Sequence, residues 1–215
     1  HGEAIQQFET AIALIDPRAT ANGASEAVRY ARLSTHSNLV DVLYNVGRYA
    51  DAVTHAQVAV DDARRLLRDS VDVASARRYF YLAANRLAAA LDGVNRVDDA
   101  IAIWNEAIAV VTQMAEADPR NNRLRFDLAV MFEGLAQFHL KTQRAAEALE
   151  AITTSFATWT VAFAADPGAK TQRFNYGMSF MILGDVQRAR GNRTAATDAY
   201  REALAVLADP AVGAR

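Results

Sequence analysis

The segment FMILGDVQRARGNRTAATDAYREA, residues 180–203, contains the pattern that decides the fold of this chain. A helical pattern that carries Phe180 and Leu183 ends at Gly191, and after this break Ala196, Tyr200 and Ala203 follow one another at spacings of four and three residues. That spacing stacks large and small residues on a single helix face, while a glycine supplies the left-handed residue that ends a helix. The segment therefore predicts two helices joined by a tight turn.

The pattern recurs along the chain at a constant spacing of 48 residues. Such a regular spacing of whole columns of residues is typical of repeat proteins. We expect an all-α fold, a right-handed α-solenoid of antiparallel helix hairpins. The small residue is found at Ala4, Ala52, Ala100, Ala148 and Ala196, the turn residue at Gly47, Asn95, Gln143 and Gly191, and a leucine of the preceding helix at Leu39, Leu87, Leu135 and Leu183.

The order of residues in the last unit resembles the tetratricopeptide repeat, which has an aromatic residue, Leu-Gly, a small residue and a second aromatic residue in these slots. Here they are Phe180, Leu183-Gly184, Ala196 and Tyr200. The unit is longer than the usual repeat of about 34 residues. Units of this length resemble the arrays that follow the kinase domain in some bacterial serine/threonine kinases, in which stretches like 118–129 (DPRNNRLRFDLA) recur. The resemblance covers nearly the whole chain.

The turn positions predict how the chain is organised. We expect one solenoid over residues 1–215, with a half repeat at 1–23 and complete repeats at about 24–70, 71–119, 120–167 and 168–210. Because the half repeat lacks its first helix, we expect the chain to be a fragment of a longer protein. Proline disfavours helix continuation, so Asp-Pro pairs at 16–17, 118–119, 166–167 and 209–210 should close helices. The expected helices are 2–16, 24–46, 49–69, 72–93, 97–117, 121–142, 145–165, 169–190 and 193–208.

Composition excludes several classes of function. The formal net charge is −2 without a clustered basic excess, which argues against nucleic acid as a partner. No uncharged apolar run approaches the roughly 18 residues of a membrane helix. The chain has no cysteine, which excludes disulfides and thiolate metal sites and leaves the compartment open. An alanine-rich, arginine-rich and lysine-poor composition suggests a bacterial source. We expect a cytoplasmic protein, or an extracytoplasmic one if the segment follows a kinase and a membrane span.

We expect no enzyme, metal or cofactor, because no group of acid and base side chains is gathered in the sequence. His36 and His139 occupy columns that hold packing residues in other units. His55 has only Asp51 at ligand spacing on its own helix. Trp104 and Trp159 are expected in the core.

Tetratricopeptide repeats place their first helices on the concave side, so the resemblance implies a groove there that binds a protein. We expect a scaffold that holds a peptide or a partner helix; the alternative is a sensory or oligomerising domain of a larger bacterial signalling protein such as a kinase. Asn85 and Gln137 could bond a peptide backbone, while Arg86 and Glu133 could fix its polarity or pair with each other. The candidate groove residues are Asn38, Asp41, Asn85, Arg86, Glu133, Gln137, Lys141, Asp185 and Arg188.

Two further features have open interpretations. An arginine column, Arg29, Arg77, Arg125 and Arg173, begins each first helix; it could bind anions or pair structurally, for instance with Asp118 and Asp166. The half repeat leaves apolar residues without their hairpin partner, which suggests a homodimer through this helix. These residues are Ile5, Phe8, Ile12 and Ile15.

Overall fold

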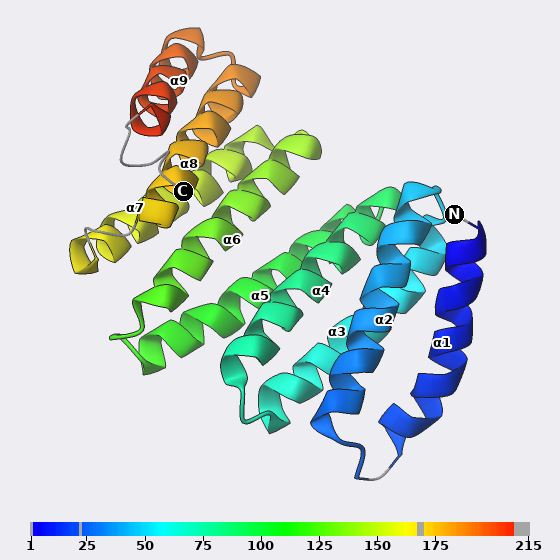
Figure 1. Cartoon of the computed structure of the whole chain (residues 1–215). Coiled ribbons are helices and arrows are strands. Elements are labelled where there is room, and N and C mark those ends of the chain that lie inside the picture. Colours follow the sequence, from blue (N-terminus) through cyan, green and yellow to red (C-terminus); the bar gives the residue numbers. More distant parts are fainter. Residues whose placement is uncertain (1, 22, 167–169, 209–215) are drawn as a thin grey trace. The chain divides into compact units, whose positions relative to one another are not determined.

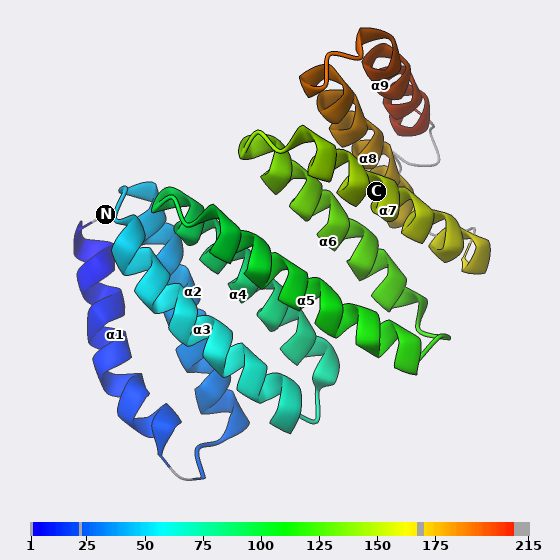
Figure 2. The ribbon, with the colours of Figure 1, turned by 180° about the vertical axis from the view of Figure 1, so that it is seen from behind.

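The computed structural model describes residues 2–21, 23–166 and 170–208, and this part of the chain forms nine helices and no strand (Figures 1 and 2). The all-α prediction is confirmed. Every helix end lies within two residues of its expected position except the end of the first helix. The helices are α1 (Gly2–Thr20), α2 (Glu26–Asn45), α3 (Tyr49–Asp69), α4 (Val73–Gly93), α5 (Val97–Ala117), α6 (Asn122–Lys141), α7 (Ala145–Ala165), α8 (Lys170–Ala189) and α9 (Arg193–Leu207).

The predicted end of α1 at Asp16 is wrong, because the helix continues through Pro17 to Thr20. Asp16 accepts hydrogen bonds from Arg32 Nε at 2.9 Å and pairs with His36 Nε2 at 3.1 Å, both from α2. These tertiary contacts hold the chain on a helical path that proline alone would disfavour. α5 ends at Ala117, before Asp118-Pro119, as expected. Pro167, Asp209 and Pro210 lie outside the described residues.

The four predicted turn residues all adopt the left-handed backbone conformation. Their φ angles are 78° at Gly47, 60° at Asn95, 61° at Gln143 and 79° at Gly191. In each turn the next residue's N–H bonds the carbonyl five residues back, at 2.8–2.9 Å, as from Arg48 to Leu43. This bond satisfies a carbonyl that the helix end leaves open. The prediction of a left-handed turn in each unit is confirmed, even where the residue is glutamine.

The chain divides into two compact units, residues 1–107 (unit 1) and residues 108–215 (unit 2), with the boundary inside α5. In unit 1, α2 contacts α1 and α3, α3 contacts α4, and the first helices α2 and α4 also touch. Ala52, Ala56 and Ala59 on α3 are at most 1% exposed. Their small size lets the helices approach closely around Leu33 and Phe80, each 1% exposed. A single solenoid over residues 1–215 stays a prediction.

In unit 2, α6 packs on α7, α8 packs on both α7 and α9, and the first helices α6 and α8 touch. Trp159 is 0% exposed and lies in a cluster with Phe126, Ala129 and Ala162. A Cβ atom at Gly184 would overlap the ring of Tyr200, so this leucine-glycine slot needs glycine. Trp104, in unit 1, is 3% exposed. Both tryptophans are therefore core residues, as predicted.

Candidate partner-binding surfaces

In unit 1, four of the candidate groove residues lie on the two first helices. Asn38 and Asp41 are on α2, while Asn85 and Arg86 are on α4. Arg86 joins the helices through a two-pronged bond to Asp41, from Nε to Oδ1 at 2.9 Å and from the second terminal nitrogen to Oδ2 at 2.8 Å. The Asn38 and Asn85 side chains are exposed beside this pair. We call these four residues the α2/α4 face.

In unit 2, Gln137 and Lys141 are exposed on α6, and Asp185 and Arg188 lie at the C-terminal end of α8. Asp185 accepts hydrogen bonds from Arg188 at 3.1 Å and from the Tyr200 hydroxyl at 2.8 Å. Asn85 and Arg86 belong to unit 1, whereas Glu133 and Gln137 belong to unit 2. Their convergence on one peptide stays a prediction.

The Glu133 carboxylate faces the interior of unit 2, because the residue is only 8% exposed. Its Oε1 accepts hydrogen bonds from Trp159 Nε1 at 2.7 Å, from Ser155 Oγ at 3.4 Å and from Ser179 Oγ. Burial raises the pKa of Glu133, although these three bonds act in the opposite direction. Within unit 1 Arg86 is bonded to Asp41, and within unit 2 Glu133 is bonded to Trp159, so the suggested Arg86–Glu133 pair, which would join the two units, stays a prediction.

The hydrogen-bond partners of Glu133 lie 22 to 46 residues away in sequence, so the helical pattern around Glu133 could not identify them. On helix phase alone, Glu133 was therefore assigned to the groove. One signal did exist. Ser155 stands in a column that holds Ala11, Ala59, Ala107 and Ala203 in the other units. A hydroxyl in an otherwise all-alanine core column indicates a buried polar partner.

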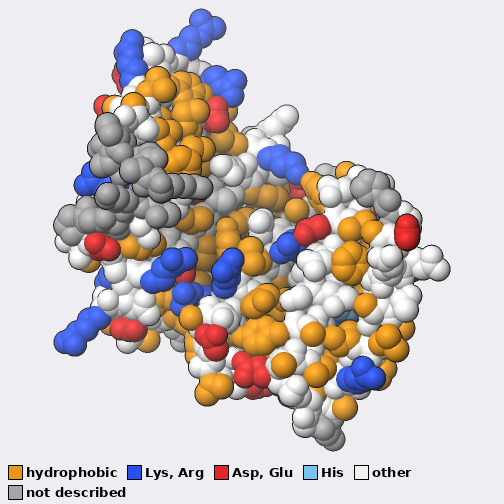
Figure 3. All heavy atoms as spheres, viewed as in Figure 1, with side chains coloured by type: hydrophobic (Ala, Val, Ile, Leu, Met, Phe, Trp, Pro, Cys, Tyr) orange, Lys and Arg blue, Asp and Glu red, His pale blue; other side chains and the backbone are white. Residues whose placement is uncertain are grey.

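α8 carries a stripe of exposed apolar side chains. Phe174, Met178 and Met181 are 42%, 38% and 37% exposed, and their spacing of four and three residues places them on one helix face. Figure 3 shows hydrophobic side chains gathered over α8. We call these three residues the α8 stripe. Helical phase puts Met178 and Met181 on the same face as the candidate groove residue Asp185, at spacings of seven and four residues, whereas the sequence did not single out Phe174.

A polar cluster joins α1, α2 and α3 in unit 1. His36 is 2% exposed, which agrees with its predicted packing position, and its Nδ1 is 3.0 Å from Nδ1 of His55. Arg32 bonds both oxygens of the buried Asp62 at 2.8 Å. Burial lowers the pKa of both histidines and raises that of Asp62. Within the described ranges, no three His, Asp or Glu side chains form a group that could hold a metal ion.

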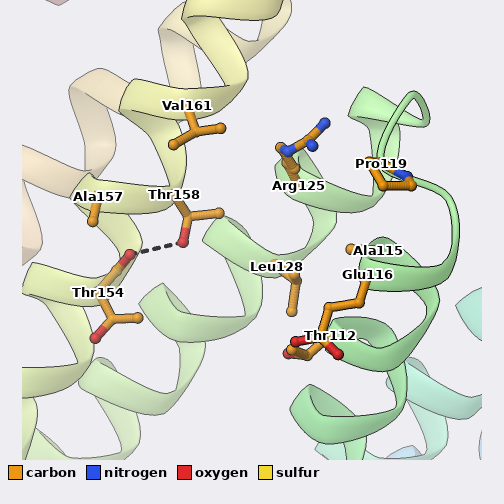
Figure 4. A pocket seen from close by; sticks show the side chains of 10 residues that line it. All are labelled: Thr112, Ala115, Glu116, Pro119, Arg125, Leu128, Thr154, Ala157, Thr158 and Val161. Carbon is orange, nitrogen blue, oxygen red and sulfur yellow. Dashed lines mark hydrogen bonds between the residues drawn. The ribbon is translucent and has the colours of Figure 1, made fainter.

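The arginine column has no common partner. Arg29 pairs with Asp69 at the end of α3, at 3.1 Å, and Arg77 is 9% exposed. Arg125 makes no hydrogen bond or ion pair with any residue that the structure describes, so the suggested pairing with Asp118 is wrong. Instead, Arg125 lines a pocket between α5, α6 and α7 (Figure 4).

The apolar residues of the half repeat are partly covered within one chain. Ile5 is buried at 9% exposure, and Phe8, Ile12 and Ile15 are half-buried on a helix that packs against α2. Leu14, which is 61% exposed, is the large apolar residue that α1 presents outward. A homodimer through this helix stays a prediction.

A comparison with known protein families matches a segment of unit 1. A family model described as tetratricopeptide repeat matches residues 32–72, which comprise most of α2 and all of α3. These two helices are joined by the left-handed turn at Gly47 and packed through the alanine column. Residues 32–72 therefore resemble one tetratricopeptide repeat.

Two solved structures are similar to this chain. BtubC (BKLC) from P. vanneervenii is 15% identical over 96% of this chain and 91% of its own, with a TM-score of 0.48. MamA protein is 13% identical over 86% of this chain and 96% of its own, with a TM-score of 0.35. No curated protein matches the sequence.

Tetratricopeptide repeats in general mediate protein–protein contacts, and the match at residues 32–72 supports that broad role here. The resemblance to the arrays of bacterial kinases stays a prediction. In the described part of the chain, the helices are too short or too polar for any of them to cross a lipid bilayer.

Proposed function

We propose that this segment is an interaction scaffold whose first helices bind an amphipathic partner helix, with the α8 stripe as the apolar contact. The observation that carries the proposal is the exposure of Phe174, Met178 and Met181 on one face of α8. Their i, i+4 and i+7 spacing matches the apolar positions of an amphipathic helix.

The composition of the stripe suits a helix better than an extended peptide. Methionine side chains are flexible and polarisable, so they adapt to the side chains of a partner helix. The stripe ends at Asp185 and Arg188, which are bonded to each other and leave further hydrogen-bonding capacity toward solvent. An apolar centre with a polar end is the usual organisation of a protein interface.

The α2/α4 face of unit 1 is suited to a different kind of contact. Asn38 and Asn85 each offer an amide donor and acceptor, and the Asp41–Arg86 pair between the helices presents both charges. These groups suit the backbone of an extended peptide segment. Gln137 and Lys141 on α6 remain candidate contacts in unit 2.

The proposal is tested by placing p-benzoylphenylalanine at Met181 and, as a matched control, at Leu204 on α9, which is 67% exposed. Illumination in cells that make the protein should join a partner to position 181 but not to position 204. Mass spectrometry then identifies the partner and the cross-linked segment.

Binding of the purified partner is then measured. The Met178→Glu/Met181→Glu variant should bind at least about tenfold more weakly, because it places charge against an apolar face. Leu204→Glu should leave the Kd unchanged. Equal cross-linking at both positions, or an unchanged Kd for the double variant with its circular dichroism intact, would remove the α8 stripe as the contact.

A further inference from the structure

The pocket beside Arg125 occupies a place that an ion pair fills one repeat earlier. In unit 1, Arg64 on α3 holds Glu106 on α5 by two hydrogen bonds, of 2.7 and 2.5 Å. The residues 48 positions later are Thr112 on α5 and Thr154 on α7. Each threonine hydroxyl bonds a carbonyl of its own helix, at 2.9 Å to Ile108 and 3.0 Å to Glu150. Two short side chains therefore replace a long bridge between successive second helices.

The replacement leaves a cavity of about 480 Å³ in unit 2. This volume lies within the range of small-molecule sites, about 300–1,000 Å³. Most of its wall is apolar, and the Thr158 hydroxyl is bonded to the Thr154 carbonyl at 2.8 Å. Figure 4 draws Arg125 at one end of the pocket and Glu116 at the other, with Leu128 between them. The apolar wall comes from Ala115, Pro119, Leu128, Ala157 and Val161.

Arg125 is the half-buried charged residue of this pocket, and it has no partner among the described residues. In the first complete repeat, Arg29 at the equivalent position pairs with Asp69, but the position equivalent to Asp69 is Ala165 in the repeat that contains Arg125. Arg125 is a half-buried residue, and its guanidinium makes no hydrogen bond or ion pair among the described residues. A partly desolvated cation without a partner favours binding of an anion, and a guanidinium matches a carboxylate in a two-pronged geometry.

The other charges restrict the type of anion. Glu116 at the far end of the pocket also lacks a described partner, so a second negative charge on the ligand would be repelled. Phosphate and dicarboxylates are disfavoured for this reason, and the apolar wall favours a hydrocarbon body. We infer that this pocket binds a small aliphatic monocarboxylate, with its carboxylate on Arg125 and its hydrocarbon chain along Leu128, Ala157 and Val161.

This site is formed by the second helices α5 and α7 together with α6, and its ligand is independent of a partner on the α8 stripe. The test uses sodium octanoate as the probe, with octylammonium chloride as a probe of equal length and opposite charge. Methyl NMR signals of Leu128 and Val161 report occupancy directly. Octanoate at millimolar concentration should shift both signals saturably, whereas octylammonium should bind at least about tenfold more weakly because it meets a cation.

Two variants separate the charge of the site from its volume. Arg125→Gln should weaken octanoate binding about tenfold or more, since it removes a charge-assisted bond, while Arg123→Gln, on the exposed side of α6, should not. The Thr112→Arg/Thr154→Glu variant rebuilds the Arg64–Glu106 pair in the third repeat. It should fill the pocket and abolish the shifts while the helical content stays unchanged.

Three results would overturn the inference. They are equal binding of octanoate and octylammonium, wild-type affinity in folded Arg125→Gln, and the absence of a saturable shift in the wild-type chain.

Discussion

The imidazole rings of His36 and His55 share a single hydrogen bond, with their Nδ1 atoms 3.0 Å apart. Nε2 of His36 is 3.1 Å from an oxygen of Asp16, so that nitrogen carries a proton and donates it. A neutral His36 therefore accepts at Nδ1 from the Nδ1–H of His55. Both rings cannot be imidazolium in this arrangement, because both Nδ1 atoms would then carry a proton.

Unit 1 should therefore lose stability in mild acid. Burial lowers the pKa of both histidines below the ordinary value of 6.5, so the unfolded chain binds more protons than the folded chain below that pH. The stability that the two neutral histidines contribute is fully present above pH 6.5. It is lost as the pH falls through their lowered folded-state pKa values. Fluorotryptophan labelling gives one fluorine NMR signal per unit, because each unit holds one tryptophan. Urea unfolding of unit 1, followed through the Trp104 signal, measures its loss of stability between about pH 7 and pH 5.

The His36→Gln/His55→Gln variant serves as the comparison. Glutamine preserves hydrogen-bonding capacity without titrating, so the pH dependence of the Trp104 transition should flatten in this range. A variant with the same slope as the wild type would show that these histidines are not its source.

Glu133→Ala should destabilise unit 2. It leaves the Trp159 N–H without its acceptor, at a cost of about 1–3 kcal/mol, while the hydroxyls of Ser155 and Ser179 keep the carbonyls of Ala129 and Asn175 as acceptors, at 2.9 and 3.2 Å. Urea unfolding of the Trp159 signal measures the loss. Glu150→Ala, on the exposed side of α7, is the matched control and should be nearly neutral.

Glu133→Gln should instead change the pH dependence. Because the folded-state pKa of Glu133 is raised, the folded chain holds this proton more tightly, and the resulting stabilisation is lost as the pH rises above the ordinary value of 4.5. Glutamine keeps an acceptor oxygen but does not titrate. The downward slope with rising pH should therefore disappear from the Trp159 transition, and its persistence would contradict the assignment.

Ala148→Leu should cost about 1–3 kcal/mol of stability through overpacking. Ala148 is 0% exposed on α7, which packs against α6, and no space is left for three more carbon atoms. Ala146→Leu adds the same volume at an exposed position of α7 and should have little effect. Equal unfolding midpoints for the two variants would contradict the packing of the alanine column.

Gln143→Gly should raise the stability of unit 2 by about 0.5–1 kcal/mol. The left-handed conformation at φ 61° is costly for a residue with a Cβ atom, and this gain exceeds the extra entropy that glycine loses on folding. Gly47→Ala makes the converse change in unit 1 and should lower stability by about 1 kcal/mol. Thermal unfolding measures both, and a destabilising Gln143→Gly would indicate that the glutamine side chain has a role of its own.

The sequence by itself determined the helices, the four left-handed turns and the buried alanine column. These features depend on local properties, namely the helical period and the backbone conformations open to each residue. Residues 16–20 are the exception, because Arg32 and His36 on another helix keep α1 intact past Pro17. Helix phase also predicted that the groove residues are accessible, and all of them except Glu133 are exposed or half-buried.

Only the tertiary structure decided which polar groups meet. Glu133 turns inward to Trp159, Arg86 pairs with Asp41, and His36 meets His55. In each case the partner comes from another helix, and a small rotation of either helix about its axis would break the contact. Helical periodicity assigns a residue to a face only within about one third of a turn. The distinction between a buried carboxylate and a groove carboxylate is finer than that, so it depends on packing rather than on sequence pattern.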